Sequence, residues 1–202
     1  MLRRSFIALL SAITGWPLAA RAQRNVLPVI GVLSSGSRES TSASPLSVVA
    51  FRQGLSDAGY VEGQNVILEY RWANNRYDRL PALVADLVGR KVDVIAALGN
   101  APTLATKSIT STIPIVFAIG TDPVELGLAV SLARPGGKLT GVSFLVVELT
   151  GKRFDLISEL VPQAKVIALL MNPNNEGTDS QRRDAQEAAP GWGPPRRMLP
   201  RR

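Results

Sequence analysis

The chain has no cysteine and no histidine among its 202 residues. These absences exclude Ser-His-Asp and Cys-His catalysis, and they exclude metal sites that depend on histidine or cysteine ligands. They also exclude disulfides, which is compatible with an exported protein that does without them. The G-x-S-x-G, G-x-G-x-x-G and G-x-x-x-x-G-K-[ST] patterns are missing too, so the common nucleophile and phosphate-binding motifs are not available.

The positive charge lies at the two ends of the chain. The formal net charge is +7, from 23 Lys and Arg against 16 Asp and Glu. Residues 1–22 carry three arginines, residues 190–202 carry four, and neither segment contains an acid. Without these seven cations the rest of the chain has 16 basic and 16 acidic residues. A nucleic-acid binder concentrates basic charge on its folded surface, so we expect no nucleic-acid partner.

Residues 1–22 are typical of an export signal. Arg3 and Arg4 precede an apolar segment over residues 6–20, and Ala20-Arg21-Ala22 has the form of a cleavage site. The order R-R-x-F-I predicts a twin-arginine signal cleaved near Ala22, with the general secretory route as the alternative. The apolar segment is short for a bilayer span and contains Gly15 and Pro17. We therefore expect a periplasmic mature protein.

Residues 190–202 differ from the rest of the chain. They read P-G-W-G-P-P-R-R-M-L-P-R-R, and a Pro-rich basic sequence of this kind cannot build a core. We interpret this segment as an aberrant tail from another reading frame or a truncated gene. The alternative is a basic recruitment tail.

Between the two ends, strand and helix patterns alternate with short connections. The length suggests one domain, or one and a part, and the 46% apolar content is ample for a core. The periodicity predicts a doubly wound, parallel α/β sheet with helices on both faces. We expect strands over residues 29–34, 66–72, 92–98, 113–119, 140–145 and 166–171, and helices over 45–58, 80–89, 103–110, 149–160, 180–189 and from Asp122 or Pro123.

The segment 114–123, P-I-V-F-A-I-G-T-D-P, organises this pattern. We interpret it as a buried strand, a polar loop and a helix start, with Asp122 as N-cap. Asp122 and Glu125 lie three residues apart, and helix capping explains them better than acid–base catalysis does. Tyr70 and Trp72 share one face of the second strand, which favours packing over a ligand platform. Arg71 should then point to the opposite face.

Several motifs resemble the periplasmic substrate-binding proteins of ABC transporters, in the subgroup related to tryptophan and other aromatic amino-acid binders. They are R-R-S-F-I-A-L-L with W-P-L-A-A-R-A-Q, F-R-Q-G-L-S-D-A-G-Y-V-E-G-Q-N-V, Y-D-R-L-P-A-L-V-A-D-L-V, I-P-I-V-F-A-I-G-T-D-P-V-E-L-G-L and R-P-G-G-K-L-T-G-V-S-F. The resemblance covers about residues 1–189.

The resemblance implies a two-lobed type I periplasmic-binding fold that closes on its ligand by a hinge motion. The first lobe would span 26–143, and residues 144–189 would be a fragment of the second lobe. Because a cleft ligand needs both walls, a chain with an incomplete second lobe should bind weakly or not at all.

The implied function is that of the solute-binding component of an ABC uptake system. It would bind a small molecule such as an amino acid, without catalysis or cofactor, and would dock on the permease subunits. Small polar groups at the strand ends would make hydrogen bonds to the ligand. From the first lobe these are Ser35, Gly36, Asn100, Thr121 and Asp122, and from the second lobe Asn172.

Two other functions stay open at this point. The first is a carboxylate-dependent α/β enzyme that acts on a sugar or nucleotide. The second is a ligand-sensing domain, which the export signal disfavours.

Overall fold

The computed structural model describes residues 27–39, 48–132, 137–146, 149–164, 166–173, 175 and 177–188. The predicted export signal, the residue 190–202 tail and the start of the predicted helix at Pro45 lie outside these residues. Among the described residues, no helix is both long and apolar enough to cross a membrane.

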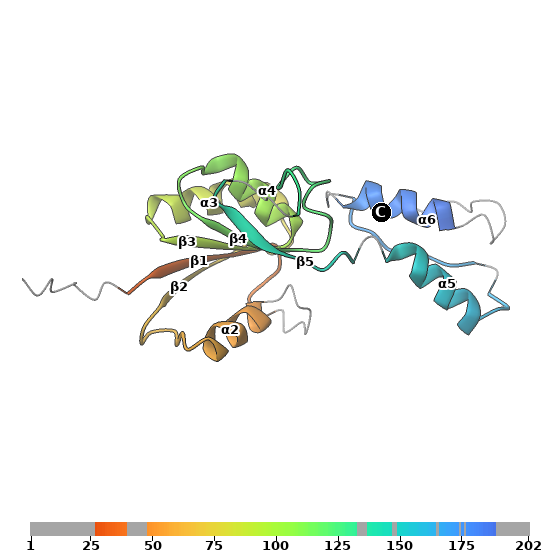
Figure 1. Ribbon diagram of the computed structural model, residues 1–202, viewed down its shortest axis with the longest axis horizontal. Helices are drawn as coiled ribbons and strands as arrows, with labels where there is room; N and C mark the ends of the chain where they lie inside the picture. The colour runs from red at the N-terminus through yellow and green to blue at the C-terminus, as the bar shows by residue number, and fades with distance from the viewer. Residues whose placement is uncertain are drawn as a thin grey trace, which may run out of the picture.

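A five-stranded parallel sheet forms the centre of the molecule (Figure 1). The strand order is β2-β1-β3-β4-β5, and every neighbouring pair is parallel. This arrangement confirms the predicted α/β class. The strands are β1 (Val29–Ser34), β2 (Ile67–Trp72), β3 (Val94–Leu98), β4 (Ile115–Ile119) and β5 (Leu139–Ser143).

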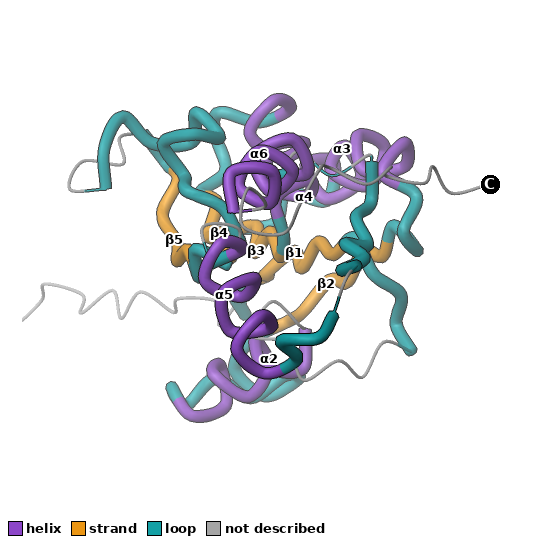
Figure 2. Tube along the Cα trace, turned by 90° about the vertical axis from the view of Figure 1, so that its right-hand side faces the viewer, coloured by secondary structure: helices purple, strands orange, loops and turns teal. Residues whose placement is uncertain are grey.

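Helices cover both faces of the sheet. The helix α2 (Val48–Asp57) lies on one face, and α3 (Leu80–Gly89) and α4 (Asn100–Ile109) lie on the other (Figures 1 and 2). A short 3-10 turn, η1 (Tyr77–Arg79), leads into α3. The right-handed crossovers of parallel strands require this two-sided arrangement.

Each face of the sheet has its own apolar core. Leu33 and Ile95 are fully buried with Leu87 of α3, whereas Val32 packs with Val48 of α2. Successive residues of a strand point to opposite faces, so Val32 and Leu33 serve different cores. Burial of each large apolar side chain contributes roughly 1.5–3 kcal/mol to folding.

The edge strand β2 follows the same alternation. The rings of Tyr70 and Trp72 stack with centroids 6.0 Å apart and pack on the α2 side. The Arg71 guanidinium instead reaches Asp86 of α3, with a hydrogen bond of 2.6 Å from its Nε. The predicted packing role of the two rings and the opposite direction of Arg71 are thus confirmed.

The predicted helix from Asp122 or Pro123 is wrong, because residues 123–127 form turns and the rest of 122–129 is not helical. The Asp122 carboxylate accepts a hydrogen bond of 2.7 Å from the Val124 amide, as an N-cap does. Gly127 then adopts φ +63°, which ends helical geometry after one turn. The Lys107 ammonium of α4 donates to the Gly127 carbonyl and fixes this turn against α4.

After β5 the chain leaves the sheet and forms a helical pair, α5 (Thr150–Leu160) and α6 (Thr178–Ala188), which lies beyond the carboxyl ends of the strands (Figure 1). The two helices contact each other, and Ala185 of α6 is buried.

The predicted sixth strand over 166–171 is wrong, because these residues pair with no strand in the described part of the chain. They run irregularly beside the helical pair, and Val166 and Leu170 are 59% and 88% exposed. A parallel strand forms only where a neighbouring strand supplies its hydrogen-bond partners, and none of the described residues after β5 is in a strand.

Candidate functional site

A pocket of about 410 Å³ lies at the carboxyl ends of β1, β3 and β4, between the sheet and the helical pair. In open parallel sheets, ligands bind at this edge. The sheet side is formed by Ser34–Ser37, Val48, Trp72, Tyr77, Leu98–Pro102, Gly120 and Thr121, and the opposite side by Val146, Arg153, Leu170–Asn172, Asn175, Gly177, Thr178 and Gln181.

The loop after β3 places Asn100 at the start of α4. Gly99 has φ +112° and ψ 166°, a conformation that residues with a Cβ rarely adopt. Its amide donates a hydrogen bond of 2.8 Å to the Ala118 carbonyl of β4. The sharp turn starts α4 three residues earlier than the sequence predicted, so Asn100 lies in the first helical turn beside β4.

Asn100 connects the loops after β3 and β4. Its side-chain amide donates a hydrogen bond of 2.8 Å to the Thr121 hydroxyl, and its carbonyl accepts one of 3.2 Å from the Gly120 amide. Thr121 is 1% exposed, and its backbone carbonyl accepts a hydrogen bond of 2.8 Å from the Ser143 hydroxyl. These bonds hold Asn100 and Thr121 in fixed positions on the pocket floor.

The loop after β1 is held by the loop after β2. The Asn75 amide donates a hydrogen bond of 2.6 Å to the Ser35 carbonyl, and the Asn74 amide donates one of 3.0 Å to the Gly36 carbonyl. Both asparagines adopt positive φ, 54° and 59°, in this tight connection. These bonds hold Ser35 and Gly36, both of which line the pocket, in fixed positions.

The opposite side of the pocket comes from residues 146–181. The Asn172 side chain approaches the Tyr77 hydroxyl at 3.5 Å, a long hydrogen bond across the two parts of the molecule. The Asn172 carbonyl accepts a hydrogen bond of 2.5 Å from Thr178 at the start of α6. Arg153, in the first turn of α5, adds a guanidinium to this side.

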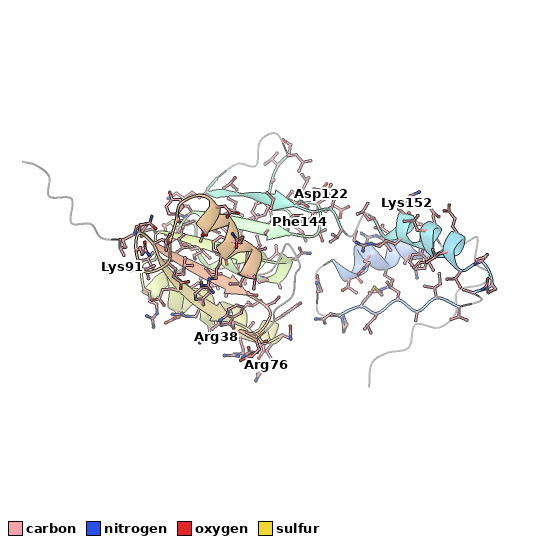
Figure 3. All side chains as sticks on the ribbon, turned by 90° about the horizontal axis from the view of Figure 1, so that it is seen from below. Arg38, Arg76, Lys91, Asp122, Phe144 and Lys152 are labelled. Carbon is pink, nitrogen blue, oxygen red and sulfur yellow. The ribbon has the colours of Figure 1, made fainter. Side chains whose placement is uncertain are left out.

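The structure brings five of the six residues predicted from strand-end positions into one pocket. Ser35, Gly36, Asn100, Thr121 and Asn172 all line it. Asp122 does not line it, since its carboxylate caps the turn at Val124. Figure 3 shows Asp122 and Phe144 at the end of the sheet that faces α5 and α6.

Sequence reasoning missed four lining side chains that could contact a ligand: Trp72, Tyr77, Arg153 and Gln181. The first was expected to pack only, yet it both packs against α2 and forms one wall. Tyr77 lies on the sheet side, in η1, and gave no pattern that marks a site. Arg153 and Gln181 carry no local signal, because their position depends on how the helical pair meets the sheet.

The lining is polar and almost uncharged. Arg153 is the one charged residue among the described lining residues, and none of them is an Asp or Glu. The described residues also contain no group of three or more acidic side chains placed to hold a metal ion. Such a surface is suited to hydrogen-bonding a small molecule and covering its apolar part with Trp72 and Leu98.

A family model described as "ABC transporter substrate binding protein" matches residues 40–193. A curated relative, the "Tyrosine-binding protein" of Clostridioides difficile strain R20291, is 33% identical over 132 residues. That match covers 65% of this chain and 37% of the relative.

Two solved structures share the fold. A "conserved domain protein" from Vibrio cholerae is 30% identical with a TM-score of 0.69, and the match covers 80% of this chain and 53% of that chain. An "ABC domain in complex with L-Trp" from Streptococcus pneumoniae is 24% identical with a TM-score of 0.68, and the match covers 81% of this chain and 53% of the other. The chain therefore spans about half the length of these structures.

Proposed function

Because the chain belongs to the ABC transporter substrate-binding protein family, we propose that its pocket binds a small amino acid-like solute without altering it. The fold is that of the type I periplasmic-binding proteins. The match covers 37% of the length of the curated relative. Transport by the whole protein is therefore also part of what we propose.

The position and lining of the pocket carry the proposal. Its volume, about 410 Å³, lies within the roughly 300–1,000 Å³ range of small-molecule sites. Hydroxyl and amide groups of Ser35, Asn100 and Asn172 would make hydrogen bonds to the polar end of the solute. Trp72 and Leu98 would cover its apolar end, which favours an aromatic side chain, and the tyrosine-binding relative supports that choice.

We assign Ser35, Gly36, Asn100, Thr121 and Asn172 to the ligand site, and Asp122 to the turn that supports it. Thr121 is buried and would act mainly by orienting Asn100. A carboxylate-dependent enzyme is disfavoured because neither Asp122 nor Glu125 lines the pocket. Glu125 instead accepts a hydrogen bond of 3.3 Å from Ser180.

Membership of this family supports our remaining assignments, which concern the lobes, the export and the transport partner. Residues 26–143 would form the first lobe, and residues 144–189 would form part of the second. The chain would be exported to the periplasm, with residues 1–22 as its signal, and would deliver its solute to the permease subunits of an ABC transporter. We expect an affinity in the millimolar range, about −4 kcal/mol of binding free energy.

Calorimetric titration of the full chain tests the proposal. L-tyrosine, L-tryptophan, L-phenylalanine and L-leucine are compared with D-glucose, each at the highest concentration its solubility allows. We expect saturable binding of the aromatic amino acids and none of glucose. No heat change with any amino acid would contradict the proposed function, whereas micromolar affinity would contradict the expected millimolar range.

Two variants locate the binding. Ser35→Trp places a ring inside the pocket, and Ser111→Trp places the same ring on the exposed connection to the other end of β4. We expect only the first variant to abolish binding while both keep the circular dichroism of the wild type. Equal binding by both would show that the solute does not occupy this pocket.

A further inference from the structure

The charge of the pocket lining is asymmetric. Its described residues include one guanidinium, Arg153, and no carboxylate. A free amino acid carries both an ammonium and a carboxylate, and a site that recognises the ammonium usually supplies an acidic partner. Among the described lining residues, the one charged partner is suited to the carboxylate and not to the ammonium.

The Arg153 guanidinium also forms no salt bridge with an acid among the described residues. Salt bridges among the described residues involve Arg52, Arg71, Arg76, Arg90 and Arg182, and none involves Arg153. Its five N–H donors therefore remain available, in a planar arrangement that matches the two oxygens of a carboxylate. Arg153 lies on the same side of the pocket as Asn172 and Gln181.

Two helices reinforce this preference. The first turns of α4, at Asn100, and of α6, at Thr178, both border the pocket. The partial positive charge at a helix N-terminus favours an anion. Together with the Arg153 guanidinium and the absence of acids among the described lining residues, these helix ends favour an anion in the pocket.

We propose that Arg153 anchors the carboxylate of the solute and that the site selects an organic monocarboxylate with an apolar group, for which an α-ammonium is dispensable. This inference rests on the proposed function and specifies its substrate class. Trp72, Leu98 and Met171 supply the apolar surface. Arg153 is then the residue that determines specificity for acids over amines.

Four phenyl compounds separate the two charges of an amino acid: L-phenylalanine, 3-phenylpropanoate, 2-phenylethylamine and L-phenylalaninamide. Each is titrated calorimetrically into the full-length chain. We expect the first two to bind with affinities within about tenfold of each other, and the two compounds without a carboxylate to bind at least tenfold more weakly, the loss of a charged hydrogen bond. Equal or tighter binding of 2-phenylethylamine would overturn the inference.

Variants assign the effect to one side chain. Arg153→Gln should weaken 3-phenylpropanoate at least about tenfold and leave 2-phenylethylamine unchanged, and Arg153→Lys should restore part of the loss. Lys152→Gln removes the neighbouring charge on α5, outside the lining (Figure 3), and should leave every affinity unchanged.

The outcomes separate this inference from the proposed function. If phenylalanine binds the wild type and Arg153→Gln equally well, the assignment of Arg153 fails while the solute-binding function stands. Equal losses in Arg153→Gln and Lys152→Gln would likewise overturn it, since only the net charge would matter. If none of the four compounds binds the wild type, both the function and the inference fail.

Discussion

The side-chain amide of Asn100 donates a hydrogen bond of 2.8 Å to the hydroxyl of Thr121. The two residues are 21 positions apart, and the bond joins the loop after β3 to the loop after β4. The Asn100 carbonyl also accepts from the Gly120 amide, at 3.2 Å. One side chain thus fixes the relative position of two of the loops that form the pocket floor.

Asn100→Ala should therefore destabilise the protein as well as weaken binding. Gly120 is buried, and its amide would lose its side-chain acceptor, which costs about 1–3 kcal/mol of unfolding free energy. Urea denaturation measures the change. Gln186→Ala, an exposed amide on α6, should change the unfolding free energy by less than about 0.5 kcal/mol. Equal stability of Asn100→Ala and wild type would show that the bridge does not hold the loops.

Gly141→Ala should destabilise the β4–β5 pairing. Gly141 lies opposite Phe117 in the register of the two strands, and a Cβ there would overlap the Phe117 carbonyl oxygen and ring. Overpacking of this kind costs about 1–3 kcal/mol. Gly54→Ala on α2 is the matched control, because a Cβ at that position meets no atom within 4 Å. It should stabilise the helix by about 0.5–1 kcal/mol. Similar denaturation midpoints for the two variants would contradict the packing at Gly141.

The Tyr70 hydroxyl should ionise at a higher pH than a free tyrosine side chain. Burial, and next a hydrogen bond of 3.0 Å donated to Glu62, raise the pKa of Tyr70 to about 12. Because the folded pKa lies above the ordinary value of 10.0, the stability from this contact is complete below that value and is lost as pH rises toward 12. Ultraviolet titration of Glu62→Gln should show a lower Tyr70 pKa, and an unchanged curve would exclude the contact.

Asp86 should make the stability depend on acid pH. The hydrogen bond from Arg71, and next the one from Arg90, lower the pKa of the Asp86 carboxyl in the folded protein. The contribution is present above the unfolded pKa of about 3.9 and is lost as pH falls through the lower folded value. Asp86→Asn should have a smaller loss of melting temperature on acidification than wild type, whereas the exposed Asp155→Asn should behave like wild type. If acidification lowered the melting temperatures of wild type and Asp86→Asn by the same amount, the result would contradict this ion pair.

The sequence predicted the sheet well because its signals are local. The apolar runs that became β1 and β3 are largely buried, as is typical of parallel strands, and Ile115, Phe117 and Ile119 of β4 are buried on one face. Tyr70, Arg71 and Trp72 could be assigned to opposite faces from alternation alone. The carboxyl ends of parallel strands meet at one edge of the sheet. The strand positions therefore predicted that four residues lie together there: Ser35, Gly36, Asn100 and Thr121.

The errors arose where tertiary context decides. Residues 122–129 have an N-cap and helical spacing, but the positive φ of Gly127 ends the helix after one turn. Residues 166–171 have strand composition but no strand partner among the described residues. Arg153 carries no local sign of a site, because its place in the pocket depends on the approach of α5 to the sheet. These features require the three-dimensional arrangement.

The most direct test of small-molecule binding at the carboxyl edge of the sheet is a backbone amide NMR titration of the full chain with L-phenylalanine. We predict saturable shifts for Gly36, Gly99 and Gly120, which line the pocket, and unchanged signals for Gly54 and Gly89 on the outer helices. Shifts confined to Gly54 and Gly89 would contradict the account. The absence of any shift at about 10 mM L-phenylalanine, ten times a Kd of about 1 mM, would contradict it as well.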